Sequence, residues 1–403
     1  MGARPKVLLM VTLDTKEAEG RFVRKCLEDA GVDVLLLDPS VRRSVTPAAE
    51  ITPEQITSAA GTTIDAVRAL GHEGKCQAVM IEGAIRCAQD LHRRGEISGV
   101  IGVGGSMGTA LGTAVMRALP FGLPKVMIST MASGMTRPYV GTRDIIMMHS
   151  VADISGLNRI TRSVFRNGAL ALAGMAREWR PEEKSDRPLV VLTTLGTTER
   201  CSARVRKALE EQGFEVVVFH TTGAGGQAME EIVREQDVAF VVDLSLVEVV
   251  DFLNHGLCSA GPDRCKAALQ KGVPTIFAAG NIDFIIAGPI DDARARYPGK
   301  RYHVHNAALT AVRTQEPELQ SLAAHLAGLI REARGPVSFF VPLHGFSAHD
   351  SPQGHLHDLS QPPLFAAHLR SVMPAGVPVI ELPCHINDDQ FADAIVARIL
   401  SQP

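Results

Sequence analysis

The strongest indication of the fold is a repeated stretch, Val11-Thr-Leu-Asp-Thr-Lys-Glu17, which returns as Thr193-Thr-Leu-Gly-Thr-Thr-Glu199. The two copies align without a gap at a constant offset of 182 residues, and the match extends from Val23 to Val34 against Val205 to Val216. In each copy an apolar run precedes the motif, apolar residues then recur at helical spacing, and a glycine stops the predicted helix before a second apolar run. Each copy therefore predicts a β-α-β unit with parallel strands and a right-handed crossover.

The whole chain is predicted to form two Rossmann-like α/β lobes with mainly parallel, doubly wound sheets, related by internal duplication. Its 403 residues are too many for one hydrophobic core, and its 36 glycines with only 4% aromatic residues favour aliphatic parallel sheets. The charged, proline-bounded segment from Arg180 to Pro188 predicts a domain boundary. We expect an amino-terminal domain over 1–180, a carboxyl-terminal domain over 187–403, and a ligand cleft between them.

Short apolar runs predict the remaining strands of both lobes. In the first lobe they fall at Gln77 to Ile81, Gly99 to Val103 and Lys125 to Ile128, and helical periodicity predicts a long helix from Ile160 to Trp179. In the second lobe the same alternation of strands and helices continues, and the predicted strands are 239–242, 273–277, 337–341 and 377–382.

The charge balance bounds the class of partner. A net charge of −3 supplies no basic field for nucleic acid and no polybasic footprint for a membrane surface. The longest apolar run near the start, Val7 to Leu13, is far too short to span a bilayer. We therefore expect a cytoplasmic protein without nucleic-acid or membrane partners, and one that assembles as a homo-oligomer.

The glycine-rich turn Gly102-Val-Gly-Gly-Ser-Met-Gly-Thr109 is the best candidate anion site. It leaves a predicted strand and enters a helix, so its backbone N–H groups can point at a phosphate. The strict dinucleotide fingerprint fails at Met107, and no Walker lysine follows. Glycines that only let the helix pack on the sheet are the alternative. The predicted ligand contacts in this turn are Gly104, Gly105, Ser106, Gly108 and Thr109.

The same residues also spell the G-x-S-x-G pattern of a hydrolase nucleophile elbow, with Ser106 in the nucleophile position. Asp144 and His149 follow in the order that such a triad requires. A serine hydrolase with Ser106 as nucleophile is therefore the alternative function.

A second group of candidates follows the first strand. Asp14, Thr15 and Lys16 lie where open α/β sheets bind ligands, so Lys16 could meet a phosphate and Asp14 a magnesium ion. Capping of the helix is an equal alternative for Asp14 and Thr15. The small, polar loop that begins at Ser129 and Thr130 is expected to border the same site.

The second lobe offers different residues. A second glycine loop contains Gly223, Gly225 and Gly226, which we take as candidates for substrate binding. Arg301 and Arg313 could grip an anionic ligand, because a guanidinium group binds a carboxylate or phosphate through two donors. Histidines are frequent in the last quarter of the chain, and a metal centre there is a weaker hypothesis than loop hydrogen bonding.

Taken together, these segments resemble the family of bacterial and plant proteins related to the ATP-binding amino-terminal region of the tomato mosaic virus resistance protein. The resemblance runs essentially from end to end. One stretch departs from it, because Asp243-Leu-Ser-Leu-Val-Glu-Val249 replaces a region that is usually rich in threonine. The segments that carry it are Thr12–Glu17, Gly102–Thr109, Ser129–Gly134, His220–Glu230, Ser259–Arg264 and His305–Thr314.

The resemblance implies ATP binding by two Rossmann-like subdomains, with Mg²⁺ as the expected companion ion. Its nucleotide contacts fall on the two turns of the first lobe already singled out. If the protein is a catalyst, Lys16 would neutralise developing charge, Asp14 would hold the metal, and a small anionic substrate would contact the second lobe. A regulatory subunit is the third hypothesis. Its expected partner is a separate TIM-barrel-like protein, because such a region follows in the plant relative.

Overall fold

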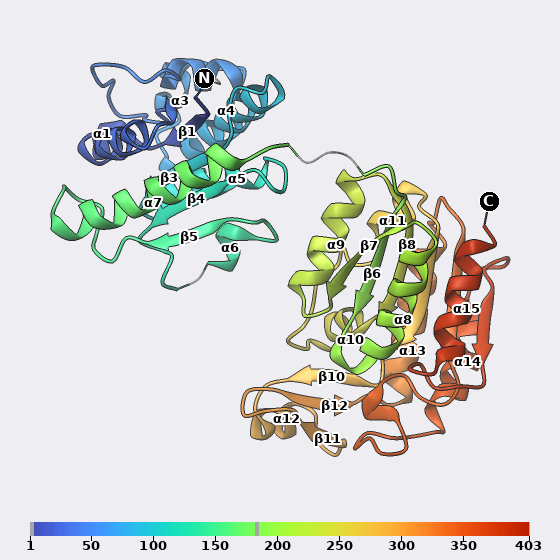
Figure 1. Ribbon diagram of the computed structural model, residues 1–403. Helices are drawn as coiled ribbons and strands as arrows, with labels where there is room; N and C mark the ends of the chain where they lie inside the picture. Colours follow the sequence, from blue (N-terminus) through green and yellow to red (C-terminus); the bar gives the residue numbers. More distant parts are fainter. Residues whose placement is uncertain (1–3, 135, 182–184, 403) are drawn as a thin grey trace. The chain divides into compact units, whose positions relative to one another are not determined.

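The computed structural model describes residues 4–134, 136–181 and 185–402 (Figure 1). The chain divides into two compact units, Met1–Glu183 and Lys184–Pro403, and each unit is described by itself. Among the described residues, none of the helices combines the length and the apolar composition needed to cross a bilayer.

The amino-terminal unit is built on one five-stranded sheet in which every pair of neighbours is parallel. The strand order is β2-β1-β3-β4-β5, so β1 is flanked by β2 on one side and β3 on the other. Met10 at the end of β1 is in register with Leu37 and with Gly102. The strands are β1 (Lys6–Met10), β2 (Asp33–Leu37), β3 (Val100–Gly104), β4 (Lys125–Ser129) and β5 (Ile146–His149).

Helices cover both faces of this sheet, as a doubly wound fold requires. Val23 of α1 (Leu13–Asp29) and Phe165 of α7 (Arg159–Glu178) belong to the core on one face. Met80 of α4 (Glu73–Arg93) and Val115 of α5 (Ser106–Arg117) belong to the core on the other face. The remaining helices of the unit are α2 (Pro53–Ala59), α3 (Ile64–Ala69) and α6 (Arg137–Val140).

The strand predicted at Gln77 to Ile81 is wrong, because these residues lie inside α4. The buried residues of this helix recur one turn apart, at Met80, Ala84 and Ala88. A five-residue apolar run cannot by itself distinguish a strand from a turn of buried helix. The fifth strand of the sheet is β5, which the sequence pattern did not predict.

The carboxyl-terminal unit contains a six-stranded parallel sheet in the order β14-β13-β9-β8-β6-β7. Read from β7, its first five strands follow the same order as the sheet of the other unit. The predicted fold of two Rossmann-like lobes with mainly parallel sheets is confirmed, and descent from a duplication stays a prediction. The strands are β6 (Leu189–Thr194), β7 (Glu215–His220), β8 (Val238–Ser245), β9 (Thr275–Gly280), β13 (Val337–Pro342) and β14 (Val379–Leu382).

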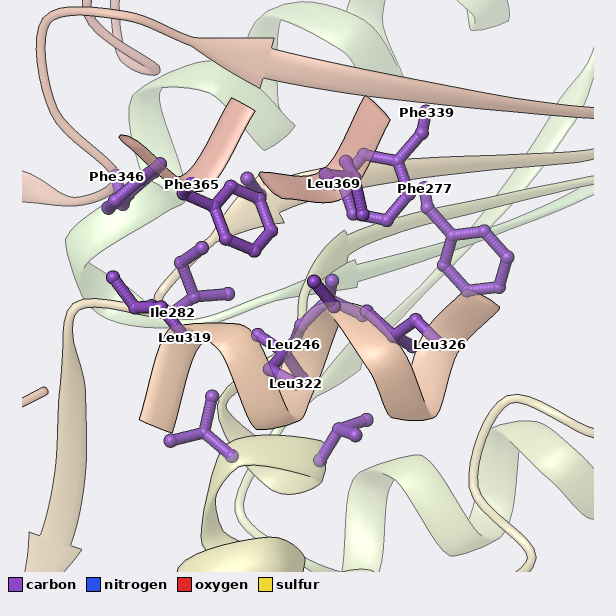
Figure 2. Close-up of a cluster of buried hydrophobic side chains, with 14 of the residues drawn as sticks. Leu246, Phe277, Ile282, Leu319, Leu322, Leu326, Phe339, Phe346, Phe365 and Leu369 are labelled. Atoms are coloured by element: carbon purple, nitrogen blue, oxygen red, sulfur yellow. The ribbon is translucent and has the colours of Figure 1, made fainter. Parts of the chain in front are cut away.

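The largest apolar core of this unit lies between its sheet and three helices (Figure 2). Phe277 of β9 stacks on Phe339 of β13, with ring centroids 6.0 Å apart. Leu322 and Phe365 pack into the same cluster, and burying each such side chain contributes about 1.5–3 kcal/mol. The helices on this face are α10 (Val247–Asn254), α13 (Glu316–Ile330) and α14 (Gln361–Val372). The other helices are α8 (Glu199–Glu211), α9 (Ala224–Glu235), α11 (Ala267–Lys271), α12 (Ile290–Arg296) and α15 (Asp389–Leu400).

A small antiparallel sheet was not predicted from the sequence. It has three strands in the order β10-β12-β11 and follows β9 along the chain. Its strands are short, and the pattern of alternating strands and crossover helices contains no signal for it. The three strands are β10 (Phe284–Ala287), β11 (Tyr302–Val304) and β12 (Thr310–Arg313).

Gly83 holds α4 close to α2. A Cβ atom at this position would lie 2.0 Å from the backbone oxygen of Ile56. Gly83→Ala should therefore lower the free energy of unfolding by about 2 kcal/mol, measured by urea denaturation. Gly174→Ala in α7 is the control, since nothing lies within 4 Å of its Cβ, and it should raise stability by about 0.5–1 kcal/mol. Equal effects of the two changes would contradict the close contact.

Candidate functional site

An open pocket of about 360 Å³ lies at the carboxyl ends of β1 and β3. In this strand order the connection from β1 leads to one side of the sheet and the connection from β3 leads to the other, which leaves a crevice between them. Ligands of open parallel sheets bind at such a switch point. The strand order therefore places a candidate site at this pocket independently of any motif.

The pocket has an apolar floor and a polar rim. The apolar lining comes from two strands, two helices and the loop after β2, through Met10, Val41, Met80, Val103, Met107 and Leu111. The rim carries Thr12, Asp14, Thr15, Arg42, Glu73 and Gln77. An apolar cavity with a few polar groups at one end is the usual form of a small-molecule site.

The turn after β1 is fixed by the turn after β2. The backbone N–H of Leu13 donates to Asp38 Oδ1 at 3.0 Å, and that of Asp14 donates to Ser40 Oγ at 2.9 Å. Asp14 in turn accepts the N–H of Arg42 on its Oδ2 at 3.1 Å. These bonds hold the carboxylate of Asp14 at the rim of the pocket, where Thr15 also lies.

The glycine-rich turn forms the start of α5, with Gly105 as its N-cap. Among the described residues, no recorded acceptor takes the backbone N–H groups of Ser106, Met107 and Gly108, whereas Thr109 N–H already donates to Gly105 O. The N-terminal turn of a helix leaves such donors free for an anion. No acidic side chain lies in the first turn of this fully described helix.

The glycines of this turn divide into two kinds. A Cβ at Gly104 would lie 2.7 Å from Gly108 Cα, so packing of the helix on its strand requires glycine there. A Cβ at Gly105 would meet nothing nearer than Thr130 Oγ1 at 3.8 Å, and one at Gly108 nothing nearer than Val103 O at 3.5 Å. Tight packing therefore explains why position 104 is a glycine, but it does not explain the glycines at positions 105 and 108.

Thr109 and Ser129 are fully buried behind the turn and are not among the pocket residues. Their hydroxyl oxygens are 2.6 Å apart, and Thr109 Oγ1 also donates to Gly105 O at 2.7 Å. These bonds position the turn against β4, and the N–H of Thr130 donates to Gly104 O at 3.4 Å. The structure brings these predicted residues together as a support for the anion site.

Helix α4 forms one wall of the pocket. The sequence pattern does not predict this wall, because it places Gln77 in a strand. Gln77 Nε2 donates to Met107 O at 2.8 Å and so ties α4 to the first turn of α5. Arg42 and Glu73 form an exposed ion pair of 2.8 Å at the rim. Only helical periodicity over the whole of α4 could have revealed this wall from the sequence.

Lys16 has a partner outside the pocket. Its ammonium donates to the backbone oxygen of Ile154 at 2.8 Å, and its backbone (φ −134°, ψ 38°) interrupts α1. Lys16 is not among the residues that line the pocket. In this structure its side chain ties the first turn of α1 to the segment that precedes α7.

We predict that Lys16→Met lowers the free energy of unfolding by about 1 kcal/mol. The substitution removes the charged donor of the Ile154 carbonyl and leaves that oxygen without a partner. Urea denaturation measures the change. Unaltered stability combined with lost ATP binding would instead place the ammonium group on the ligand.

The hydrolase alternative requires a triad that the structure does not assemble. Asp144 lies at the amino end of the sheet, where it accepts Gly122 N–H at 2.8 Å and pairs with Lys125 Nζ at 2.9 Å. Ser106 and His149 lie at the carboxyl end, after β3 and at the end of β5. The length of β5 therefore separates the acid from the other two groups.

We predict that a fluorophosphonate probe does not label Ser106 above background, because the acid of the expected triad lies at the opposite end of the sheet and cannot orient a base beside the serine. Mass spectrometry of the treated protein measures the adduct. A label that disappears in Ser106→Ala would contradict this assignment.

The second glycine loop is filled by the protein itself. The N–H groups of Gly223 and Gly226 both donate to Glu248 Oε1, at 2.6 and 2.9 Å. Arg264, which is 2% exposed, pairs with Glu248 at 2.8 Å and with Asp243. Gly225 packs against the backbone of His220, where a Cβ would lie 1.9 Å from its oxygen. An internal carboxylate thus occupies this anion nest.

The two arginines predicted to grip an anion lie in different surroundings. Arg301 is half-exposed and donates to His357 O at 2.7 Å and to Asp358 Oδ2 at 3.0 Å. Arg313 is 2% exposed and lies between Asp283 and Asp350. Across the described residues, no group of three or more histidine, cysteine or acidic side chains is arranged to hold a metal ion.

Both units match the family described as "Uncharacterised protein family (UPF0261)". Its N-terminal domain matches residues 5–181 and its C-terminal domain matches residues 187–402. The chain belongs to the UPF0261 family. A UPF0261 protein of Clostridium tetani is 34% identical over 98% of both chains, and one of Mesorhizobium japonicum is 36% identical over 97% of this chain and 98% of its own.

The expected resemblance to the tomato protein is also found. The ToMV resistance protein Tm-1(GCR237) of Solanum lycopersicum is 35% identical over 75% of this chain and 41% of its own length. The solved structure of a pyrethroid hydrolase is much less similar. The pyrethroid hydrolase PytH is 14% identical over 53% of this chain and 98% of its own, with a TM-score of 0.29, a likeness too low to support a functional argument.

Proposed function

We propose that the amino-terminal unit of this UPF0261 protein binds ATP in the pocket at the switch point. One observation carries the proposal: the pocket of about 360 Å³ is lined by Met107 and Gly108 of the α5 turn whose backbone donors have no recorded partner. A ligand with an apolar ring at one end and phosphates at the other matches both parts. The proposal of ATP binding therefore depends on the match between the apolar pocket and the adenine ring, and between the free backbone donors and the phosphates.

The orientation of the nucleotide follows from the lining. Adenine would lie on the apolar floor near Val41, Met80 and Leu111, and the phosphates would accept the N–H groups of the first turn of α5. The positive end of the helix adds a favourable field of about 0.3–1 kcal/mol for a nearby anion.

Asp14 is the residue that would hold Mg²⁺. Its carboxylate stands at the rim of the pocket, fixed by the N–H of Arg42. Mg²⁺ is commonly bound by one or two carboxylates together with the phosphates and waters, so a single protein ligand suits an ion that arrives with ATP. At this site the ion would neutralise phosphate charge close to the start of α5.

The two units differ in how they treat an anion nest. In the carboxyl-terminal unit the amides of Gly223 and Gly226 hold Glu248, whereas α5 has no acidic side chain in its first turn. The α5 donors are therefore open to an external anion. Either an enzyme that acts on a small anionic substrate or a regulatory subunit could use this bound nucleotide.

We predict opposite effects of Gly105→Asp on stability and on ATP binding. The backbone of Gly105 (φ −75°, ψ −159°) suits an L-residue, and its Cβ has room. An N-cap aspartate should raise the free energy of unfolding by about a few tenths of a kcal/mol. Its charge would occupy the phosphate position, and the dissociation constant for ATP, measured by titration calorimetry, should rise at least about tenfold.

Gly105→Asn is the matched control, because it keeps the size and the cap but carries no charge. It should weaken ATP binding less than Gly105→Asp. If the aspartate variant binds ATP as tightly as the original protein, the phosphates do not lie at this turn and the proposal is wrong.

A further inference from the structure

A second cluster of charged residues is buried in the carboxyl-terminal unit, far along the chain from the ATP pocket. Arg313 of β12 is in register with Phe284 of β10, and Asp283 directly precedes that strand. The guanidinium Nη1 lies 3.7 Å from Asp283 Oδ2 and 3.4 Å from Asp350 Oδ2. All three charged side chains are at most 2% exposed.

Three polar atoms of this cluster lack a partner. Within the part of the chain that the structure describes, Arg313 Nε, Arg313 Nη2 and Asp283 Oδ1 are buried and make no hydrogen bond. Leaving such groups unsatisfied costs about 1–3 kcal/mol each, and more for charged groups. Nε–H and Nη2–H point from the same edge of the guanidinium plane, which is the edge that binds a carboxylate through two parallel bonds.

The charge of this cluster depends on the protonation of its two carboxyl groups. Burial raises the pKa of Asp283 to about 7, with a further contribution from the neighbouring Asp350. Burial raises the pKa of Asp350 as well, against the lowering effect of Arg313. Near neutral pH both carboxyl groups can therefore hold protons, and a bound carboxylate would then balance the charge of Arg313.

The segment 343–358 covers the cluster. Ser347 Oγ donates to Asp283 Oδ2 at 2.6 Å, and the N–H groups of Phe346 and Asp358 donate to Asp350 at 3.2 and 2.9 Å. His349 packs on Phe284 with ring centroids 5.5 Å apart. Burial lowers the pKa of His349 to about 4, so this part of the cover is uncharged at neutral pH.

We propose that this cluster binds a small 2-hydroxycarboxylic acid. The two carboxylate oxygens would accept from Arg313 Nε and Nη2, and the hydroxyl would donate to Asp283 Oδ1, so each of the three unpartnered atoms gains a bond. The proposed ligand is small because Phe346, Ser347 and Asp358 of the segment 343–358 contact the two carboxyl groups of the cluster. The site does not depend on ATP binding in the other unit.

Other ligands fit the cluster less well. A divalent cation would be repelled by Arg313, and the described residues offer no metal cluster. A simple carboxylate such as acetate would satisfy Arg313 and leave Asp283 Oδ1 unpartnered. The hydroxyl group is therefore the feature on which recognition should depend, since buried polar groups that lose a partner discriminate strongly.

The test uses the full chain with glycolate, acetate and inorganic phosphate as probes. Glycolate should raise the thermal midpoint and slow amide hydrogen exchange in the segments 282–286 and 343–358, while the amino-terminal unit is unaffected. Acetate should bind at least about tenfold more weakly. Equal binding of acetate, tighter binding of phosphate, or no effect of glycolate on exchange in these segments would each overturn the proposal.

Arg313→Lys keeps the charge and removes the two-donor edge, so it should weaken glycolate binding at least about tenfold. Arg301→Lys is the matched control, because it makes the same change at a half-exposed arginine bound to Asp358, and it should leave the affinity unchanged. If Arg313→Lys does not fold, the exchange measurement on the original protein decides the question by itself.

Discussion

Parallel pairing of β1 with β2 on one side and with β3 on the other fixes the positions of the two turns that meet at the pocket of the amino-terminal unit. The register places the ends of the strands, Met10, Leu37 and Gly102, side by side. Because the two connections leave toward opposite faces, the turns after β1 and β3 face each other across a crevice. The apolar floor, the rim carboxylate and the free amides of α5 all follow from that divergence.

The two units differ in what satisfies the backbone donors at the start of a helix that follows a glycine-bearing turn. Both contain a strand, a glycine-bearing turn and a helix, and both expose backbone donors at the start of that helix. In the carboxyl-terminal unit Glu248 satisfies those donors and is itself held by Arg264, so the nest is a structural joint. In the amino-terminal unit the donors face a pocket. The two turns follow strands that do not correspond in the two sheets, so a similar local arrangement is closed by an internal carboxylate in one unit and faces a pocket in the other.

The sequence predicted the parts of the fold that local pattern controls. The repeated β-α-β units, the long helix α7 and the turn at Gly105 could all be read from periodicity and glycine placement. The helical structure of α4 could not be read in this way, because the short apolar run around Met80 is compatible with either a strand or a turn of buried helix. The surroundings of Lys16 and Arg313 were also hidden, since their partners Ile154 and Asp283 lie far from them in the chain and only tertiary packing brings them together.

The single hydrogen bond from Gln77 to Met107 O joins the wall that would contact a base to the turn that would contact phosphates. The two ends of the pocket are therefore mechanically coupled. If the proposed nucleotide binds here, a change in the contact between its base and α4 could be transmitted to the amides at the start of α5 through this bond. Selection among nucleoside triphosphates would then appear in how firmly the phosphates are held, although the triphosphate group is the same in each of them.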